Sequence, residues 1–312
     1  MIKIMDPKAK RQTVFLLVDG NAIIHRAFHA LPPTLTDGHG HPTNAVFGFA
    51  RIFLASLGRF EPQYVAVALD MPGPTFRDKL FEEYKAKRVK APQELYDQIP
   101  SVKKLLDALE VPWFGVEGFE ADDVIGTLAH RIVREMLQTD VVIVTGDNDA
   151  LQLVNHRVKV AMPQKGAQEP MIMSAAAVEG KFGIKPSQIV DFKALRGDAS
   201  DNIPGVRGIG EKTAVMLLQQ FGTVSNLYRN LDKVDSEPVR KKLADSAEES
   251  QLSLELAKIK TDVPLDFKLS RARVHDYDRA AAEKFLHSLN MKSLIARLPE
   301  SHRKQGDQTS LF

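Results

Sequence analysis

Short apolar runs alternate with longer amphipathic stretches in the first half of the chain. Residues 14–18 form a continuous run of apolar and β-branched residues, which is the pattern of a strand buried on both faces of a sheet. Residues 64–69 and 141–144 repeat this pattern. Three shorter runs are further candidates: residues 111–116, 158–161 and 171–173. The pattern therefore predicts three clear strands and additional short ones.

Apolar positions at helical spacing fill the intervals between these strands. The predicted helices span residues 21–30, 43–57, 100–109 and 121–137. Strands that alternate with helices are typical of a mostly parallel sheet. We therefore predict an α/β fold with a mostly parallel central sheet flanked by helices.

The composition changes along the chain and predicts separate regions. Residues 73–100 are rich in Lys and Arg and short in branched apolar residues, which indicates a partly helical excursion from the core. After about residue 185, short helices (187–194, 213–221 and 252–259) are joined by Gly-rich turns. The predicted regions are a basic N-terminal extension (1–13), an α/β core (14–184), a helical subdomain (185–298) and a polar, disordered tail (299–312).

The overall composition is that of an ordinary soluble globular protein, with 44% hydrophobic and 26% charged residues among 312. No apolar run approaches the roughly 20 residues that a membrane helix needs, so we expect no membrane partner. The chain has no Cys, which excludes disulfides and thiolate ligands and suits a reducing cytoplasm. We expect a cytoplasmic monomer.

Nine carboxylates lie where a metal site at the edge of a sheet would require them. Asp19, Asp70 and the pair Asp147 and Asp149 follow predicted strands, and α/β sheets bind ligands beyond these strand ends. The other five form two clusters: Glu120, Asp122 and Asp123, and then Asp198 and Asp201. Helix capping explains any one of these acids equally well. It does not explain all of them, because clustered like charges repel unless a cation intervenes.

The chemistry of these side chains indicates which ions and partners they suit. Oxygen ligands without His or Cys favour Mg²⁺ or Mn²⁺, and nine carboxylates suit two ions better than one. Two such ions about 4 Å apart can activate a water and stabilise the leaving oxygen of a phosphodiester. The net charge is +2, but setting the nine acids aside leaves 31 acidic against 42 basic residues. A basic surface around one acidic site indicates a nucleic-acid partner.

Five sequence blocks around these acids resemble the signatures of the 5′ nuclease (flap endonuclease) superfamily. They are LVDGN at 17–21, ALD at 68–70, FEADD at 119–123, TGDND at 145–149 and RGDASDNIPG at 196–205. The likeness extends in order from residue 14 to about 298 and is greatest to the 5′→3′ exonuclease domains of bacterial DNA polymerases I. It implies a PIN-like core with a helical arch and a helical DNA-binding subdomain.

The resemblance also assigns roles to the acids. It implies a first metal site at Asp19, Asp70, Glu120, Asp122 and Asp123. It implies a second metal site at Asp147, Asp149 and Asp201, with Asp198 nearby. Among these, the resemblance points to Asp19, Asp70, Asp122, Asp147 and Asp149 as catalytic.

Residues 203–222 resemble a helix-hairpin-helix, with GVRGIGEKTA at 205–214. Gly208 and Gly210 allow the backbone to approach a phosphate, and Lys212 and Thr213 lie at the start of a helix whose N-terminus favours anions. Such a motif binds the backbone of a duplex without reading its sequence. A plain Gly-rich connection between helices is the alternative. By resemblance, the motif also holds a K⁺ ion through backbone carbonyls.

The basic excursion contains EYKAKR at 83–88, which resembles the arch through or beneath which a single-stranded 5′ end passes. The resemblance implies that Lys85 and Arg88 neutralise the region of the scissile phosphate and that Tyr84 stacks on a base. By composition alone, a solvated helix explains this segment equally well. Two further DNA contacts are expected, at Arg26 and Arg77.

The chain ends in QTSLF at 308–312, which resembles the peptide that binds the bacterial sliding clamp. A polar leader would present Leu311 and Phe312, preceded by Gln308, to a hydrophobic groove. The alternative is a tail end without function. The position of this peptide at the C-terminus suggests a stand-alone nuclease.

These observations predict a metal-dependent 5′→3′ exonuclease and structure-specific 5′ flap endonuclease. The enzyme would act on DNA by a two-metal-ion mechanism in replication and repair. One alternative is a catalytically weak DNA-binding member of the same fold, although all nine acids are present. The other is a PIN-type ribonuclease, which would lack the hairpin motif and the basic arch.

Overall fold

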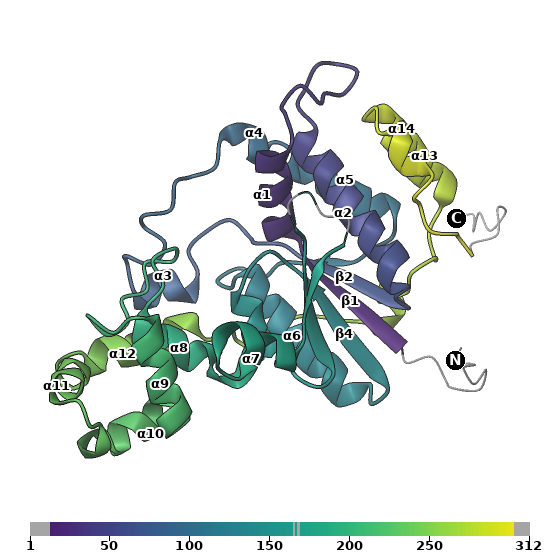
Figure 1. The fold of residues 1–312 in the computed structure, drawn as a ribbon. Helices are drawn as coiled ribbons and strands as arrows, with labels where there is room; N and C mark the ends of the chain where they lie inside the picture. The colour runs from purple at the N-terminus through teal and green to yellow at the C-terminus, as the bar shows by residue number, and fades with distance from the viewer. Residues whose placement is uncertain (1–12, 165, 167–168, 303–312) are drawn as a thin grey trace.

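One six-stranded sheet forms the centre of the computed structural model, which describes residues 13–164, 166 and 169–302 (Figure 1). The strands are β1 (Thr13–Asp19), β2 (Tyr64–Ala68), β3 (Trp113–Phe114), β4 (Thr139–Val144), β5 (Val158–Met162) and β6 (Met171–Met173). Their order is β3-β2-β1-β4-β5-β6, and every neighbouring pair is parallel except β5 and β6. The predicted mostly parallel α/β sheet is confirmed.

The register of the central strands brings three strand ends to one edge of the sheet. Asp19, the last residue of β1, lies opposite Ala68, the last residue of β2. Val18 lies opposite Val144, the last residue of β4. Residues that follow these three strands therefore emerge side by side.

The two faces of the sheet are covered by different helices. Successive residues of a strand point to opposite faces. Leu16 and Val18 belong to an apolar cluster that includes residues of α1 (Gly20–Ala30), α2 (Asn44–Phe60) and α5 (Ile99–Ala108). Phe15 and Leu17 pack on the other face with residues of α6 (Ala121–Glu135). Each of these helices begins within one residue of its predicted start.

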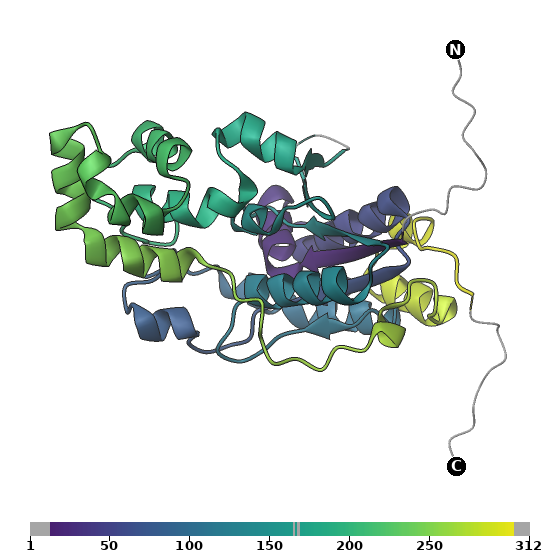
Figure 2. The same cartoon turned by 90° about the horizontal axis from the view of Figure 1, so that it is seen from below.

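Beyond the sheet, the chain forms a lobe of short helices (Figure 2). They are α7 (Ala175–Phe182), α8 (Ile189–Arg196), α9 (Glu211–Phe221), α10 (Val224–Arg229), α11 (Glu237–Asp245) and α12 (Ala247–Ala257). Leu195, Leu217 and Leu227 belong to the same apolar cluster as Phe15 and Leu17, so the lobe is continuous with the core. Among the described residues, no helix is long and apolar enough to span a bilayer.

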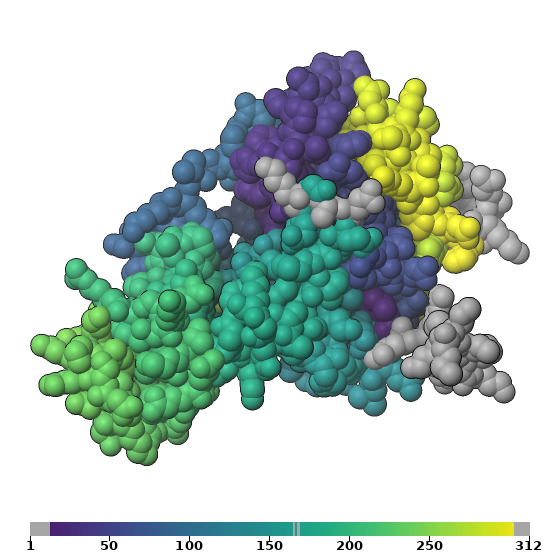
Figure 3. Space-filling view, viewed as in Figure 1, coloured from purple at the N-terminus to yellow at the C-terminus, as the bar shows by residue number. Residues whose placement is uncertain are grey.

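The end of the described chain returns to the sheet and corrects one predicted boundary. Helices α13 (Arg279–Ser288) and α14 (Lys292–Ile295) lie beside α2 and α5 (Figure 1). The space-filling view shows them, in yellow, at the opposite end of the molecule from the green helical lobe (Figure 3). Their apolar residues Leu286 and Leu294 are buried in the cluster that contains Leu16 and Val18. The predicted subdomain 185–298 is therefore too long, because an apolar stripe on a helix does not reveal which element covers it.

The basic excursion is less helical than an arch would be. It contains α3 (Phe76–Leu80), a run of turns over residues 82–87, and α4 (Gln93–Tyr96). Lys85 has a left-handed backbone with φ of 54°, which interrupts any helix at this point. The backbone N–H of Lys85 donates to the carbonyl of Asp201 over 2.9 Å, so these turns lie against the loop that follows α8.

A buried ion pair fastens the excursion to the core. Arg77 on α3 is 2% exposed and Asp123 on α6 is fully buried. The guanidinium donates to both carboxylate oxygens, with Nη1 to Oδ2 at 2.7 Å and Nη2 to Oδ1 at 2.9 Å. Bidentate Arg–carboxylate pairs combine strength with a fixed geometry.

The same pair also holds the segment that leaves the helical lobe. Arg77 donates to the carbonyls of Leu256 and Lys258, and the backbone N–H of Lys260 donates to Asp123. These bonds correct two expectations. Arg77 is too deeply buried to contact DNA, and the oxygens of Asp123 accept hydrogen bonds from Arg77, Glu120 and Lys260 rather than being free for a metal ion.

We expect Arg77→Met and Asp123→Asn each to lower the free energy of unfolding by about 3–5 kcal/mol, because each leaves a buried charge without its partner. Urea unfolding of the whole chain measures this. Glu135→Gln removes a partner from exposed ion pairs with Arg131 and Arg134 and is the control, with an expected loss below about 1 kcal/mol. Equal losses in all three variants would contradict the assigned role.

Candidate active site at the carboxyl edge of the sheet

Asp19 is fixed at the end of β1 by two hydrogen bonds. Its Oδ1 accepts the N–H of Ala22 over 2.9 Å, which caps the first turn of α1. Its Oδ2 accepts the hydroxyl of Thr145 over 2.7 Å. Thr145 also accepts the N–H of Asp147 over 3.0 Å, so it links the acids that follow β1 and β4.

Asp70 joins this edge to the start of α6. It follows β2 by two residues, and its Oδ1 accepts the N–H of Ala121 over 2.7 Å. Glu120 is the N-cap residue of α6, and Asp122 lies in its first turn. The sheet and α6 thus bring Asp19, Asp70, Asp122 and Asp147 close enough to interact electrostatically.

The third group of acids lies beside the helical lobe and is held by Lys193. This residue lies on α8 and is 8% exposed. Its ammonium contacts Asp149 at the start of a 3-10 turn and lies 2.6 Å from Oδ2 of Asp198. Asp201 is also buried and is paired with Arg88.

The acids interact strongly enough to change one another's protonation. Burial raises the pKa of Asp19 from 3.8 to about 7, and the charges of Asp70 and Asp147 add to this rise. Burial also raises the pKa of Asp122 well above 3.8, with contributions from Asp19 and Asp147. These carboxylates are costly to ionise because nothing in the described chain neutralises them.

Asp149 and Asp198 differ from Asp19 and Asp122 because they form ion pairs with Lys193. Burial raises the pKa of Asp149 to about 6, although Lys193 opposes the rise. Against a similar effect of burial, Lys193 lowers the pKa of Asp198 to about 2. In the described part of the chain, no Lys or Arg pairs with four of the acids: Asp19, Asp70, Asp122 and Asp147.

The donor set fits hard divalent cations. All the side chains are carboxylates, which Mg²⁺ and Mn²⁺ prefer, and four of them have no basic partner in the described chain. Within the described residues, no three acidic or His side chains already converge as ligands of one ion. Unneutralised like charges resist such convergence, and a divalent cation would remove that resistance.

Besides Arg77, two basic side chains of the excursion contact the carboxylates. Nζ of Lys85 lies 2.6 Å from Oε1 of Glu120, and Arg88 pairs with Asp201. Lys85 and Arg88 thus lie beside the acids of the cluster, and their contact with a phosphate stays a prediction. Tyr84 is different: its side chain is 5% exposed and its hydroxyl donates to Glu120 over 3.2 Å, so its ring offers no open face for a base.

The region predicted as a helix-hairpin-helix, residues 203–222, contains the end of the loop at 197–210 and helix α9, and α8 precedes this loop. Gly208 has a φ of 81° and is exposed, and Gly210 is the N-cap of α9. Gly210 has no side chain to cap the helix, so the N–H groups of its first turn, which includes Lys212 and Thr213, suit an anion.

Two glycines make the hairpin loop possible. Gly197 and Gly205 have φ of 76° and 64°, which side chains disfavour. A Cβ on Gly205 would lie 2.2 Å from the N of Gly197, so only glycine allows the two arms to cross. The crossing is closed by paired hydrogen bonds between Asp198 and Ile203, which fix Asp198 beside Lys193.

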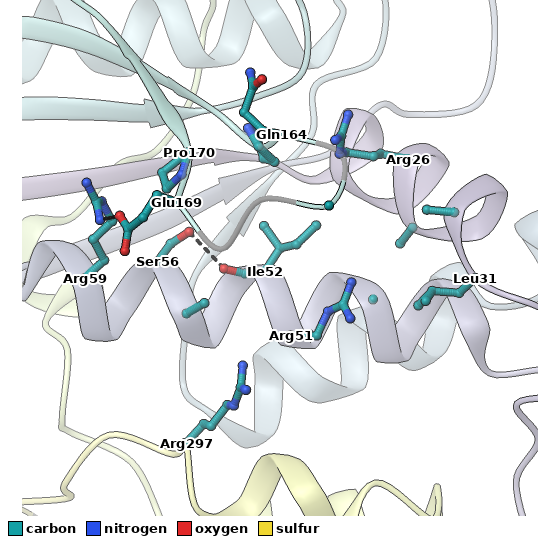
Figure 4. A pocket seen from close by; sticks show the side chains of 16 residues that line it. Arg26, Leu31, Arg51, Ile52, Ser56, Arg59, Gln164, Glu169, Pro170 and Arg297 are labelled. Atoms are coloured by element: carbon teal, nitrogen blue, oxygen red, sulfur yellow. Dashed lines mark hydrogen bonds and ion pairs between the residues drawn. The ribbon is translucent and has the colours of Figure 1, made fainter.

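Arg26 lines a cleft of about 710 Å³, which is formed by residues of α1 and α2 together with Gln164, Glu169 and Pro170 (Figure 4). Arg51, Arg59 and Arg297 also line this cleft, and Arg59 is paired with Glu169. The cleft is therefore basic, and none of the nine predicted acids lines it.

Sequence reasoning missed Lys193 and Thr145. Thr145 belongs to the TGDND block, so its position directly after β4 was a usable signal. Lys193 had no such signal, because it is one of 42 basic residues and its partner Asp149 is 44 residues away.

Two descriptions of known families match consecutive parts of the chain. "5'-3' exonuclease, N-terminal resolvase-like domain" matches residues 14–183, and "5'-3' exonuclease, C-terminal SAM fold" matches residues 184–280. The second match ends at residue 280, within α13.

Curated relatives agree with this result. A 5'-3' exonuclease of Aquifex aeolicus is 36% identical over 301 residues, covering 96% of this chain and 100% of the relative. DNA polymerase I of Chloroflexus aurantiacus is 44% identical over 295 residues, covering 92% of this chain. The chain spans about a third of the length of the DNA polymerase I relatives, for example 31% of this one.

Solved structures share the fold at low identity. "Divalent metal ions (zinc) bound to T5 5'-exonuclease" has a TM-score of 0.63 at 21% identity, with 91% of this chain and 99% of the other covered. A pseudo-enzyme-product complex of a T5 flap endonuclease with DNA and metal ions has a TM-score of 0.65 at 18% identity, over 91% and 99% of the two chains. The family matches cover most of this sequence, and the chain is a nuclease of the 5'-3' exonuclease family.

Proposed function

We propose that this nuclease cleaves DNA phosphodiesters at 5′ ends and at 5′ flaps, with two Mg²⁺ or Mn²⁺ ions. The observation that carries the proposal is the group of buried, mutually interacting carboxylates at the edge of the sheet, four of which lack a basic partner in the described chain. The T5 flap endonuclease, whose complex contains DNA and metal ions, shares this fold and supports the substrate class.

The assignment of the acids to two ions rests on the resemblance to the 5′ nuclease superfamily. Asp19, Asp70, Glu120 and Asp122 would hold one ion, and Asp147, Asp149 and Asp201 would hold the other, with Asp198 behind them. When bound, such ions supply Lewis acidity to the attacking water and to the leaving oxygen of the phosphodiester. Thr145 and Ala121 orient Asp19 and Asp70 through their hydrogen bonds. Lys85 and Arg88, which pair with Glu120 and Asp201 in the absence of DNA, would bind the phosphate that is cleaved.

The groups around the cluster would hold the rest of the DNA. The exposed turn at Gly208 and the start of α9 suit the backbone phosphates of a duplex. The turns at 82–87 border the same cluster and suit the single-stranded arm of a flap. We also propose three points that rest on the sequence: a K⁺ ion at the hairpin, a monomeric state, and binding of Gln308, Leu311 and Phe312 to a sliding clamp. These last residues lie outside the described part of the chain.

Removal of Asp147 is expected to abolish catalysis without abolishing binding. Asp147→Ala should slow Mg²⁺-dependent cleavage of a 5′-labelled flap by more than about 100-fold, because a metal ligand is lost, while the variant still shifts the flap in a gel. Asp262→Ala, an exposed acid outside the cluster, is the control. Cleavage at the wild-type rate by Asp147→Ala would overturn the proposal, and efficient cleavage of single-stranded RNA instead of the flap would favour a ribonuclease.

Stabilisation by Mg²⁺ should increase with pH. The pKa of Asp19 is about 7 in the folded chain and 3.8 ordinarily, so the folded state binds the extra proton. Metal-free protein therefore loses stability as pH rises from about 4 through 7. Mg²⁺ at about 100 times its dissociation constant adds about 2.7 kcal/mol, and only where the carboxylates are ionised.

Melting temperatures with and without Mg²⁺ at pH 5.5 and pH 8 test this expectation. Asp19→Asn, which keeps the size but not the charge, should reduce the difference between the two pH values. An equal Mg²⁺ effect at both pH values in the wild type would show that the buried acids do not bind the ion.

The arginine-lined cleft should contribute salt-sensitive binding of DNA. Arg26→Ala and Arg51→Ala should each weaken binding of the flap and reduce the dependence of log K on log salt by about 1, because each removes a phosphate contact. Gel shifts in Ca²⁺ over a range of salt concentrations measure both quantities. Unchanged salt dependence in both variants would exclude the cleft from the DNA path.

A further inference from the structure

Lys193 is less exposed than Lys85 and Arg88, the two cations near the turns of the excursion that contact the acids. Its side chain is 11% exposed, compared with 26% for Lys85 and 46% for Arg88. Lys85 and Arg88 lie in or next to the turns of the excursion. Lys193 lies on α8, whose neighbouring residues Ala194 and Leu195 are fully buried in the core.

The contacts of Lys193 join two segments that supply acids. Its ammonium bridges Asp149, which follows β4, and Asp198, which follows α8. Asp198 is further fixed by Ser200, whose N–H and hydroxyl donate to its Oδ1 over 2.9 and 2.6 Å. Asp149 donates its N–H to Asp147 over 2.9 Å, so the bridge also reaches the acids that have no basic partner in the described chain.

We propose that Lys193 is a built-in counter-ion that sets the affinity of the second carboxylate group for its divalent ion. The inference rests on the proposed metal-dependent function and assigns Lys193 as a positioning residue. In the metal-free protein, it neutralises Asp149 and Asp198 and keeps the two segments together. When a divalent ion is present, the same fixed positive charge repels it and weakens its binding.

This arrangement makes opposite predictions for stability and for metal affinity. Loss of the charge leaves buried carboxylates without a partner, so the metal-free chain becomes less stable. The same loss removes a positive charge that contacts Asp149 and Asp198, which would hold or border the ion, so metal binding becomes tighter. A residue that only packs or only orients its neighbours would change both quantities in the same unfavourable direction.

The test titrates Mn²⁺ into the whole chain without DNA and measures binding by calorimetry. The second site is identified as the binding event that is lost in Asp149→Asn. Lys193→Met should bind Mn²⁺ at this site roughly tenfold more tightly than the wild type. Its melting temperature should fall without metal and recover with saturating Mn²⁺. Lys193→Gln keeps hydrogen-bonding capacity without the charge, and it serves as the second variant if Lys193→Met does not fold.

Two controls separate charge from structure. Lys193→Arg keeps the positive charge and should retain wild-type affinity, and Lys241→Met removes an exposed charge on α11 and should change neither quantity. Unchanged or weaker Mn²⁺ binding in Lys193→Met and Lys193→Gln, with wild-type binding intact, would overturn this inference alone. Absence of Mn²⁺ binding to the wild-type chain would overturn it together with the metal-dependent function.

Discussion

Repulsion among buried carboxylates at one edge of the sheet is the constraint that shapes this site. Each acid is costly to ionise because it is shielded from water, and each charged neighbour adds to that cost. The chain offsets part of the cost with four of its own cations: Arg77, Lys85, Arg88 and Lys193. The acids nearest β1 receive no such partner in the described chain, and the elevated pKa values of Asp19 and Asp122 are the consequence.

A cluster of this kind requires a scaffold that prevents the acids from moving apart. Hydrogen bonds across the parallel strands fix the three strand ends level with one another. The bond from Ala121 to Asp70 fixes the start of α6 against this edge. The buried pair of Arg77 and Asp123 fastens the excursion and the segment at 256–260 to α6. Elements far apart in sequence therefore hold the charged site together.

The sequence predicted the parts of this arrangement that depend on local pattern. Continuous apolar runs revealed the strands, and parallel strands place the following acids at one edge, so Asp19, Asp70 and Asp147 could be grouped in advance. The partners of buried charges could not be predicted. Asp123 looks like its neighbour Asp122 in sequence, and only the contact with Arg77, 46 residues away, shows that it is structural. Tyr84 in a basic run suggested base stacking, but its hydroxyl points to Glu120.

The difference between exposed and fixed cations gives the site two kinds of counter-charge. In the proposed reaction, divalent ions would take over the carboxylates while substrate phosphates would take over Lys85 and Arg88, so each charge keeps a partner before and after the exchange. Lys193 cannot move to a substrate phosphate in the same way, because α8 is packed into the core. This helix also precedes the loop of the hairpin that would hold the duplex. A fixed charge at this position therefore links the geometry of α8 and of the loop that follows it to that of the carboxylates, and displacement of α8 would change both.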